Sequence, residues 1–252
     1  ICDELISRDI PCEPYLALSG SLAVAFLIFL FVVVYLFSSL FSKSRGNTIV
    51  LMGLCDAGKT TMLVKLVQGK MIDTVTSMQA NEITCKELHK ETVQRTKSSI
   101  NFVDFPGHNR LRSATIYQES LDKAAGIIYV LDMQTFNQQV RANADYLYEI
   151  LTNAGTYKGN TIIQIACNKS EDVMATSKQI RKKLESELDK VRATRSRGPG
   201  DVGEGDNDTI ILGETSSPFS FDQLPFEIVF CECSVKEDNL DSVKNFIRRA
   251  VP

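Results

Sequence analysis

Residues 53–60 read Gly-Leu-Cys-Asp-Ala-Gly-Lys-Thr, a complete G-x-x-x-x-G-K-T phosphate loop. The two glycines, Gly53 and Gly58, let backbone N–H groups close around phosphate oxygens in conformations that a side chain would obstruct. Lys59 supplies a positive charge for the outer phosphates, and Thr60 places a hydroxyl on the Mg²⁺ that neutralises them. This stretch therefore predicts a nucleotide-binding fold.

The sequence on either side of the loop supplies the strand and the helix that the motif requires. Residues 48–52 form a short apolar run suited to a buried strand, and residues 61–67 carry apolar side chains at helical spacing. The alternative is a glycine-rich turn that binds nothing. A pattern of this length in this context favours the phosphate loop.

An uncharged apolar stretch runs from Leu16 to Phe37 and ends sixteen residues before the loop. As a helix, its 22 residues would reach ~33 Å, enough to cross a hydrocarbon core of ~30 Å. A cleaved signal peptide is the alternative, but its apolar region is usually about 7–15 residues long and follows a basic start. We predict a short N-terminal segment (1–15), a single transmembrane helix (16–37), a tether (38–46) and a soluble domain (47–252).

Charges that flank the apolar stretch predict its orientation. Lys43 and Arg45 follow it and only Arg8 precedes it, so residues 1–15 are expected in the lumen and residues 47–252 in the cytosol. The net charge of −3, without a basic tract interleaved with aromatic residues, argues against direct nucleic-acid binding. Seven scattered cysteines without a repeated C-x-x-C argue against a disulfide framework or a zinc site.

Apolar runs alternate with helical patterns through the soluble domain and predict an α/β fold. Helical stripes lie at residues 144–154 and 240–250. Such alternation predicts a mostly parallel sheet with helices on both faces, in which ligands bind at the carboxyl ends of the strands. The predicted strands are Thr48–Met52, Ile83–Leu88, Ile100–Asp104, Gly126–Asp132, Thr161–Cys167 and Phe226–Cys231.

Residues 193–218 break the alternation, because they contain five glycines, two prolines and many acidic or hydroxyl side chains. We predict a flexible surface insertion. Within it, the apolar segment 210–212 is expected to dock either locally or onto a partner. A basic cluster nearby would face anionic lipid or a ribosome, or would lie on a solvated helix face, which is the favoured reading. Its members are Arg181, Lys182, Lys183, Arg192, Arg195 and Arg197.

Three later loops add chemistry to the phosphate loop. Asp104-Phe-Pro-Gly107 is a D-x-x-G, in which the Asp holds a water of the Mg²⁺ shell and the Gly offers its N–H to the γ-phosphate. Asn168-Lys169 begins an N-K-x-D guanine site, and Ser234-Val-Lys236 is an S-x-K that closes over the base. Four such loops in this order, each after a strand, indicate a Ras-like GTPase of the P-loop NTPase class.

Within that superfamily the chain most closely resembles the family of signal recognition particle receptor beta subunits. The resemblance rests on the apolar stretch close to the phosphate loop, on residues 104–112, and on a late insertion that ends at residues 221–225, before residues 232–236. It implies GTP or GDP with Mg²⁺ as ligands and the receptor alpha subunit as partner. It also implies a single-pass protein of the endoplasmic reticulum membrane, near a ribosome or translocon, that acts in co-translational protein targeting.

The resemblance also assigns roles by position. Thr76 would be the first-switch hydroxyl that joins the metal in the GTP state, with Thr74 and Ser77 as alternatives. Thr60 would bind the metal directly, and Asp104 would hold it through water. The residues expected around the phosphates and the metal are Gly53, Asp56, Ala57, Gly58, Lys59, Thr60, Thr61 and Gly107.

The base site departs from the usual pattern at one position. The carboxylate expected to accept hydrogen bonds from guanine N1 and N2 is Glu171 rather than Asp, so either Glu171 retracts or the adjacent Asp172 takes its place. We expect GTP to remain preferred, with reduced discrimination against ATP, since one good bidentate contact contributes ~1–3 kcal/mol. The expected base contacts are Asn168, Lys169, Glu171, Asp172, Ser234, Val235 and Lys236.

His108 follows the D-x-x-G, where Ras-type enzymes keep a water-orienting Gln. A histidine can orient water or accept its proton, and the alternative is a surface histidine without a role. Arg110 and Arg112 are given no catalytic role, so slow hydrolysis is expected. The favoured function is an anchored GTP-binding switch, and an Arf-like cycling GTPase of membrane or vesicle traffic is the alternative. A spanning helix favours the first, because nucleotide state cannot release it from the bilayer.

Overall fold

The computed structural model describes residues 26–33, 46–72, 80–86, 88, 99–107, 115–159, 161–195 and 210–251. The chain divides into two compact units, Ile1–Ser44 and Arg45–Pro252. In the first unit, residues 26–33 form a helix whose apolar side chains are exposed. Within the described ranges, no helix has both the length and the apolar character needed to cross a membrane. Most of the predicted segment 16–37 lies outside those ranges.

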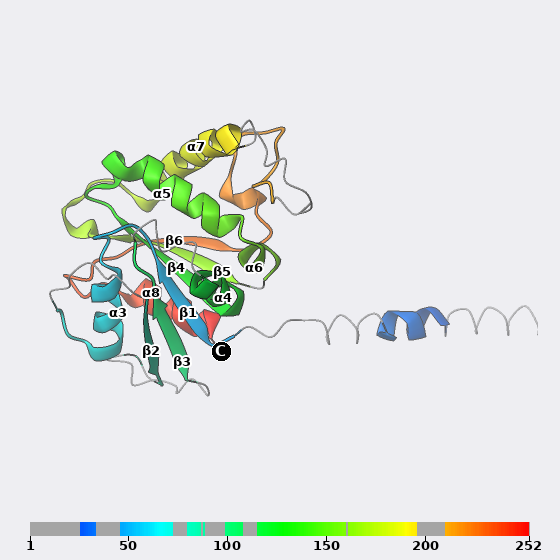
Figure 1. The fold of residues 1–252 in the computed structure, drawn as a ribbon, viewed down its shortest axis with the longest axis horizontal. Coiled ribbons are helices and arrows are strands. Elements are labelled where there is room, and N and C mark those ends of the chain that lie inside the picture. Colours follow the sequence, from blue (N-terminus) through cyan, green and yellow to red (C-terminus); the bar gives the residue numbers. More distant parts are fainter. Residues whose placement is uncertain are drawn as a thin grey trace, which may run out of the picture. The chain divides into compact units, whose positions relative to one another are not determined.

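The second unit is built on one six-stranded sheet with the order β2-β3-β1-β4-β5-β6 (Figure 1). All neighbouring strands run parallel except β2, which pairs antiparallel with β3. The carboxyl ends of the five parallel strands therefore meet at one edge of the sheet. The strands are β1 (Thr48–Met52), β2 (Asn81–Cys85), β3 (Ile100–Asp104), β4 (Ala124–Asp132), β5 (Ile162–Asn168) and β6 (Ile228–Glu232).

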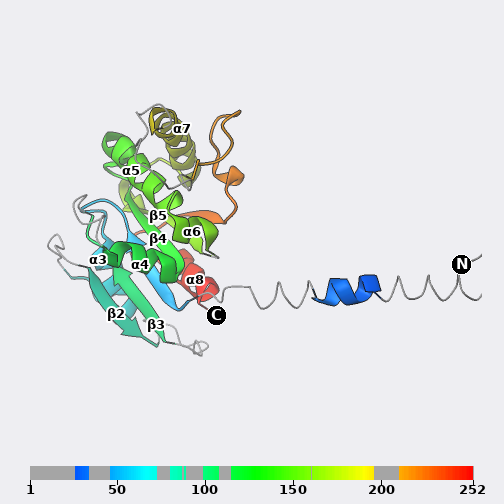
Figure 2. The ribbon, with the colours of Figure 1, turned by 45° about the vertical axis from the view of Figure 1, so that its right-hand side comes forward.

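Helices cover both faces of this sheet, as predicted. In Figure 1, α4 lies before the strands and α8 lies behind them, and Figure 2 shows the same layers after a turn of 45°. One layer comprises α4 (Thr115–Lys123), α5 (Phe136–Leu151), α6 (Ala154–Lys158) and α7 (Ser177–Arg195). The other comprises α3 (Lys59–Gln68) and α8 (Asp241–Ala250). Two short 3₁₀ turns, η2 (Ser170–Asp172) and η3 (Phe221–Gln223), complete the unit.

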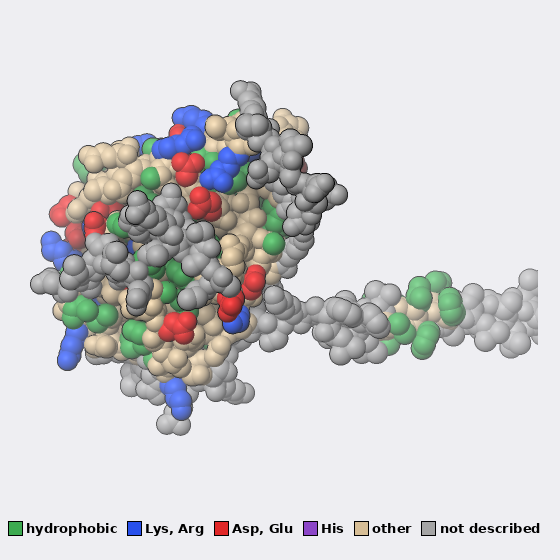
Figure 3. Space-filling model, viewed as in Figure 1, with side chains coloured by type: hydrophobic (Ala, Val, Ile, Leu, Met, Phe, Trp, Pro, Cys, Tyr) green, Lys and Arg blue, Asp and Glu red, His purple; other side chains and the backbone are tan. Residues whose placement is uncertain are grey.

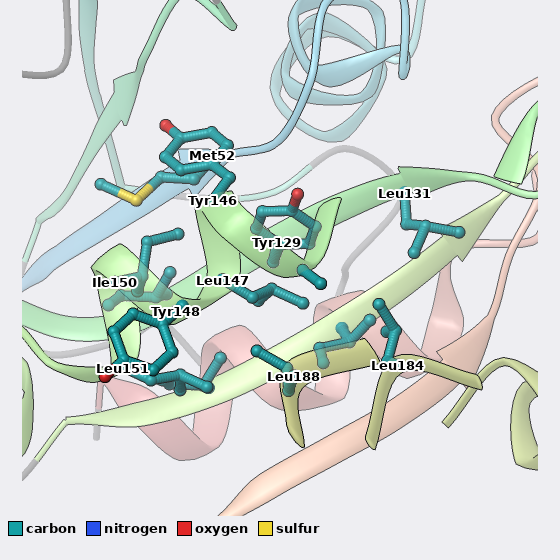
Figure 4. Packing of buried hydrophobic residues seen from close by; sticks show 14 of the residues in the cluster. Met52, Tyr129, Leu131, Tyr146, Leu147, Tyr148, Ile150, Leu151, Leu184 and Leu188 are labelled. Carbon is teal, nitrogen blue, oxygen red and sulfur yellow. The ribbon is translucent and has the colours of Figure 1, made fainter. Parts of the chain in front are cut away.

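Each helical layer packs on alternate side chains of the central strands. Ile127, Tyr129 and Leu131 of β4 face the layer of α4, α5 and α7, whereas Ile128 and Val130 face α3 and α8. Figure 4 shows the first of these cores, where side chains of α5 and α7 meet β1 and β4. Both faces of the central strands are buried, which explains why their sequences are continuously apolar rather than alternating.

The strands β4, β5 and β6 differ from the predicted bounds by one or two residues at one or both ends, and two other elements differ more. The strand predicted at Ile83–Leu88 lies at Asn81–Cys85, because antiparallel pairing with β3 begins opposite Asp104 and sets its position. The helical stripe predicted to run through Ala154 is interrupted, since α5 ends at Leu151. The side chain of Asn153 then caps a new helix, α6, by accepting hydrogen bonds from the backbone N–H groups of Gly155 and Thr156.

The final turns of α7 hold residues 210–218 against the domain. Arg192 is buried, and its guanidinium donates hydrogen bonds to the carbonyls of Leu212 (3.2 Å), Glu214 (2.6 Å) and Ser217 (2.8 Å). Leu212 itself is fully buried, so this part of the predicted insertion docks locally. The prediction of Arg192 as a solvated charge is wrong, because the returning chain presents carbonyls that need donors.

Two other members of the predicted basic cluster are paired with carboxylates. Arg181 pairs with Glu185 and Asp222, while Arg195 pairs with Glu149. Charged side chains of both signs lie together over α5 and α7 (Figure 3). The described part of this surface therefore carries charges of both signs.

Candidate nucleotide site

The phosphate loop connects β1 to α3, and its two glycines are fixed by close contacts. Gly53 has φ 139°, and a Cβ there would lie 2.1 Å from the carbonyl oxygen of Val130 on the neighbouring strand. Gly58 has φ 90°, and a Cβ there would lie 2.5 Å from Nδ2 of Asn168. Both positions therefore require glycine, for backbone conformation and for space.

The first turn of α3 is arranged to receive an anion. Gly58 is its N-cap residue and provides no side-chain cap for the first backbone N–H groups. Lys59 is buried, and its Nζ donates to the carbonyl of Leu54 at 2.7 Å, which holds the ammonium group beside the loop. Helix N–H groups without a side-chain cap, next to an ammonium group, are typical of a phosphate-binding arrangement.

The metal side of the site joins α3 to β3. The Thr60 hydroxyl donates to Oδ2 of Asp104 at 2.5 Å, and Asp104 is 1% exposed. Burial raises the pKa of Asp104, although the Thr60 hydrogen bond and the positive charge of Lys59 partly oppose this. Oδ1 of Asp104 has no hydrogen-bond partner in the described part of the chain. A buried carboxylate oxygen without a partner beside a hydroxyl fits a hydrated Mg²⁺.

No group of three His, Cys, Asp or Glu side chains able to hold a metal occurs within the described ranges. Mg²⁺ in nucleotide sites typically uses one or two protein ligands together with phosphate oxygens and water. Thr60 would supply the direct ligand and Asp104 the water-mediated one. The metal would neutralise phosphate charge when bound.

Gly107 brings the D-x-x-G against the phosphate loop. A Cβ on Gly107 would lie 2.3 Å from the backbone nitrogen of Cys55 and 2.9 Å from the carbonyl oxygen of Gly53. Only glycine permits this approach. Gly107 therefore lies directly against the phosphate loop.

Asn168, at the end of β5, joins the base side of the site to the phosphate side. Its Nδ2 donates to the carbonyl of Ala57 at 2.9 Å, and its Oδ1 accepts from the backbone N–H of Val235 at 3.2 Å. Lys169 makes a second connection, since its Nζ donates to the carbonyl of Asp56 at 3.0 Å. The phosphate loop, the N-K motif and the S-x-K motif thus form one connected structure.

The two candidate base carboxylates have different surroundings. Burial alone would raise the pKa of Glu171, but a hydrogen bond with the Ser234 side chain and the positive charges of Lys236 and Lys169 lower it overall. Oε2 of Glu171 is inaccessible to solvent and has no hydrogen-bond partner among the described residues. Asp172 is exposed. Glu171 is therefore the carboxylate that contacts the S-x-K loop, whereas Asp172 faces solvent.

The described site residues lie at the carboxyl edge of the sheet, in the loops that leave it and in the first turn of α3. Thr76 and His108, predicted for the first switch and for water orientation, lie outside the described residues, as do Arg110 and Arg112. One participant was missed: Asp132, which pairs with Lys169. The sequence could have indicated Asp132, because it ends the predicted strand Gly126–Asp132 and so lies at the carboxyl edge of the sheet.

Comparison with known proteins agrees with this geometry. The family model for the signal recognition particle receptor beta subunit matches residues 44–229. The chain belongs to this family. The receptor subunit beta of Mus musculus is 34% identical over 217 residues, which cover 86% of this chain and 78% of the mouse protein.

Two solved structures share the fold. The mammalian signal recognition particle receptor is 30% identical with a TM-score of 0.68, over 81% of this chain and 99% of that one. The SRb-GTP/SRX complex of the receptor from Chaetomium thermophilum is 19% identical with a TM-score of 0.61, over 82% and 98% of the two chains. The family match includes the phosphate loop, the D-x-x-G and the N-K motif, and it ends before Ser234-Val-Lys236.

Proposed function

We propose that this beta-family chain is the membrane-anchored GTP-binding switch of a signal recognition particle receptor and that it holds the receptor alpha subunit in its GTP state. The observation that carries the proposal is the position of Asn168. Its amide connects the phosphate loop at Ala57 with the S-x-K loop at Val235, so one nucleotide can contact all three segments. Such an arrangement serves recognition of guanine together with its phosphates.

Switching would follow from the contacts between Asp104, Thr60 and Gly107. Asp104 and Thr60 hold each other, and Gly107 lies against the phosphate loop. A γ-phosphate with its metal would compete for these groups and reorder the segment after β3. The relative from Chaetomium thermophilum, solved as an SRb-GTP/SRX complex, supports a GTP-bound state that engages a partner.

The anchor is the second part of the proposal. Residues 16–37 contain no charged side chain, and Lys43 and Arg45 follow them. The full chain, expressed in cells, is expected to remain in the membrane pellet after alkaline extraction, with residues 47–252 accessible to added protease. Release into the supernatant would contradict a spanning segment. Localisation in the endoplasmic reticulum beside a ribosome or translocon stays a prediction from the family.

Capture of the alpha subunit tests the switch directly. The full chain is loaded with a non-hydrolysable GTP analogue, with GDP or with the corresponding ATP analogue, and the bound alpha subunit is quantified. We expect retention with the GTP analogue and little with the other two. Equal retention in all three states would contradict a nucleotide-controlled grip.

A pair of matched variants separates the site from general folding. Thr60→Ala removes the hydroxyl that holds Asp104 and would bind the metal, so GTP-dependent capture should be lost. Thr152→Ala removes a hydroxyl that donates to the carbonyl of Tyr148 near the end of α5, away from the phosphate loop. Capture by the second variant should be unchanged, and equal loss in both would show that the effect is not specific to the site.

The Arf-like cycling alternative differs in turnover. No arginine finger is assigned within the chain, so single-turnover hydrolysis should be slow without a partner. Unaided turnover on the order of 1 s⁻¹ would favour a cycling enzyme over a GTP-held switch.

A further inference from the structure

Asp132 is a buried carboxylate at the carboxyl end of β4 that belongs to none of the four motifs. It is 8% exposed, and its Oδ1 accepts a hydrogen bond from the backbone N–H of Gln134 at 2.8 Å. Its Oδ2 lies 2.8 Å from Nζ of Lys169. The backbone bond fixes the carboxylate, and the fixed carboxylate in turn holds the lysine.

Lys169 is held from two directions. Its Nζ contacts Asp132 from the sheet and the carbonyl of Asp56 from the phosphate loop, at 2.8 and 3.0 Å. Its backbone adopts the left-handed conformation with φ 61°, which a non-glycine residue keeps only where its surroundings impose it. Asp56, with which it bonds, has φ 61° as well. The Lys169 side chain thus joins two residues with positive φ.

The neighbouring bonds limit where a base can lie. The backbone N–H of Met133, next to Asp132, donates to the carbonyl of Asn168 at 2.9 Å, so the ends of β4 and β5 are tied together. Asn168 bonds to Ala57 on one side and to Val235 on the other. The Nζ of Lys169 is held by Asp132 and Asp56, and its backbone follows the anchored Asn168. The aliphatic stem of Lys169 is therefore a fixed surface between the phosphate loop and the base motifs.

We propose that Asp132 is a positioning residue for nucleobase binding: by holding the Lys169 ammonium, it fixes the lysine stem as one wall of the base site. The inference rests on the proposed GTP function. An ordinary ion pair that only stabilises the fold is the competing explanation. The two differ in one respect: a positioning residue affects ligands that carry a base and leaves base-free phosphate ligands unchanged.

Two ligands distinguish these explanations when their dissociation constants are measured with the full chain in Mg²⁺. GTP carries the base, whereas inorganic tripolyphosphate presents only the phosphates. Asp132→Asn should weaken GTP binding about tenfold, or ~1.4 kcal/mol, and change tripolyphosphate binding less than about twofold. Asp145→Asn, which removes a carboxylate paired with Arg141 on the surface of α5, should change neither.

A double-mutant cycle tests whether Asp132 acts through Lys169. Lys169→Met should reproduce the selective loss of GTP affinity, and adding Asp132→Asn to it should cause no further loss. Equal loss for GTP and tripolyphosphate, no loss at all, or full additivity in the double variant would overturn the inference. A wild-type chain that binds tripolyphosphate but not GTP would instead overturn the proposed function, and the inference with it.

Discussion

Two sets of buried polar groups, one on α7 and one at the carboxyl edge of the sheet, differ in how their hydrogen bonds are met. On α7, the guanidinium of Arg192 bonds to three backbone carbonyls and to Asp189 at 2.5 Å. At the carboxyl edge of the sheet, one oxygen of Asp104 and one of Glu171 are inaccessible and have no hydrogen-bond partner in the described structure.

For these two sets, we interpret the difference as that between a structural contact and a binding site. A buried group with its partners contributes to stability, whereas a buried group without one costs stability. Such a cost is expected where a ligand will later supply the partner, and perturbed carboxylates gather at functional sites for this reason. The Arg192 region should therefore respond to mutation in stability, and the sheet edge should respond in binding.

Arg192→Ala should give the largest effect. Three carbonyls would lose a charged donor, and hydrogen bonds to charged groups typically contribute about 1.5–3 kcal/mol each on removal of the partner. Allowing for access of water to the freed carbonyls, we expect the free energy of unfolding in urea to fall by about 3 kcal/mol. Affinity for GTP should stay unchanged.

Arg195→Ala is the matched control, one turn further along α7. Arg195 is half exposed, lies 4.9 Å above the ring of Tyr148 and pairs with Glu149 at 3.4 Å. Its loss should reduce stability by less than about 1 kcal/mol. Similar losses in the two variants, or reduced GTP affinity in Arg192→Ala, would remove the distinction between the two regions.

The sequence was sufficient to predict the sheet edge because its motifs are local. Each motif follows a strand, and parallel strands place their carboxyl ends at one edge. The sequence therefore predicts that the phosphate loop lies near Asp104 and Asn168, as the contacts Thr60–Asp104 and Asn168–Ala57 show. The predicted helix-covered sheet is confirmed for the same reason: continuous apolar runs such as β4 need cover on both faces.

The sequence could not predict contacts that depend on a returning chain. Arg192 lies in a run of charged residues typical of a solvated helix, and only the path of residues 210–218 makes it a buried donor. The choice between Glu171 and Asp172 likewise depends on Ser234, which is distant in the sequence. The position of β2 depends on pairing with β3 and not on its own weakly apolar sequence.

Asp104→Asn tests the metal side of the sheet edge. The amide still has an oxygen to accept the Thr60 hydroxyl, so the free chain should lose no stability. It cannot ionise to order a metal-bound water, so the enhancement of GTP affinity by Mg²⁺ should fall about 10- to 100-fold, as for other outer-shell metal partners. Isothermal titration with and without Mg²⁺ measures both quantities. Asp222→Asn changes an exposed carboxylate far from the phosphate loop in sequence and should keep the full Mg²⁺ enhancement of GTP affinity.

The raised pKa of Asp104 fixes the sign of its pH dependence. Because the folded pKa lies above the ordinary value of 3.8, the folded chain holds this proton more tightly than the unfolded chain. The ionised form therefore costs stability above the folded pKa, and the cost disappears as pH falls through it. Binding of Mg²⁺ needs the ionised form of Asp104. The enhancement of GTP affinity by Mg²⁺ should therefore weaken as pH falls through the folded pKa. If the Mg²⁺ enhancement of GTP affinity depended on pH in the same way in the wild type and in Asp104→Asn, Asp104 would not be the titrating group.

Glu171→Asp should produce the smallest change and the most informative one. The shorter side chain would not reach Ser234, and its carboxylate would be free to accept both hydrogen bonds from guanine. We expect the ratio of GTP to ATP affinity in competition binding to rise about fivefold, near the lower end of the ~1–3 kcal/mol for a bidentate contact. Asp172→Asn should leave the ratio unchanged, because that side chain is exposed. A change in the ratio with Asp172→Asn alone would make Asp172 the base ligand and Glu171 a structural partner of Ser234, like the buried contacts of α7.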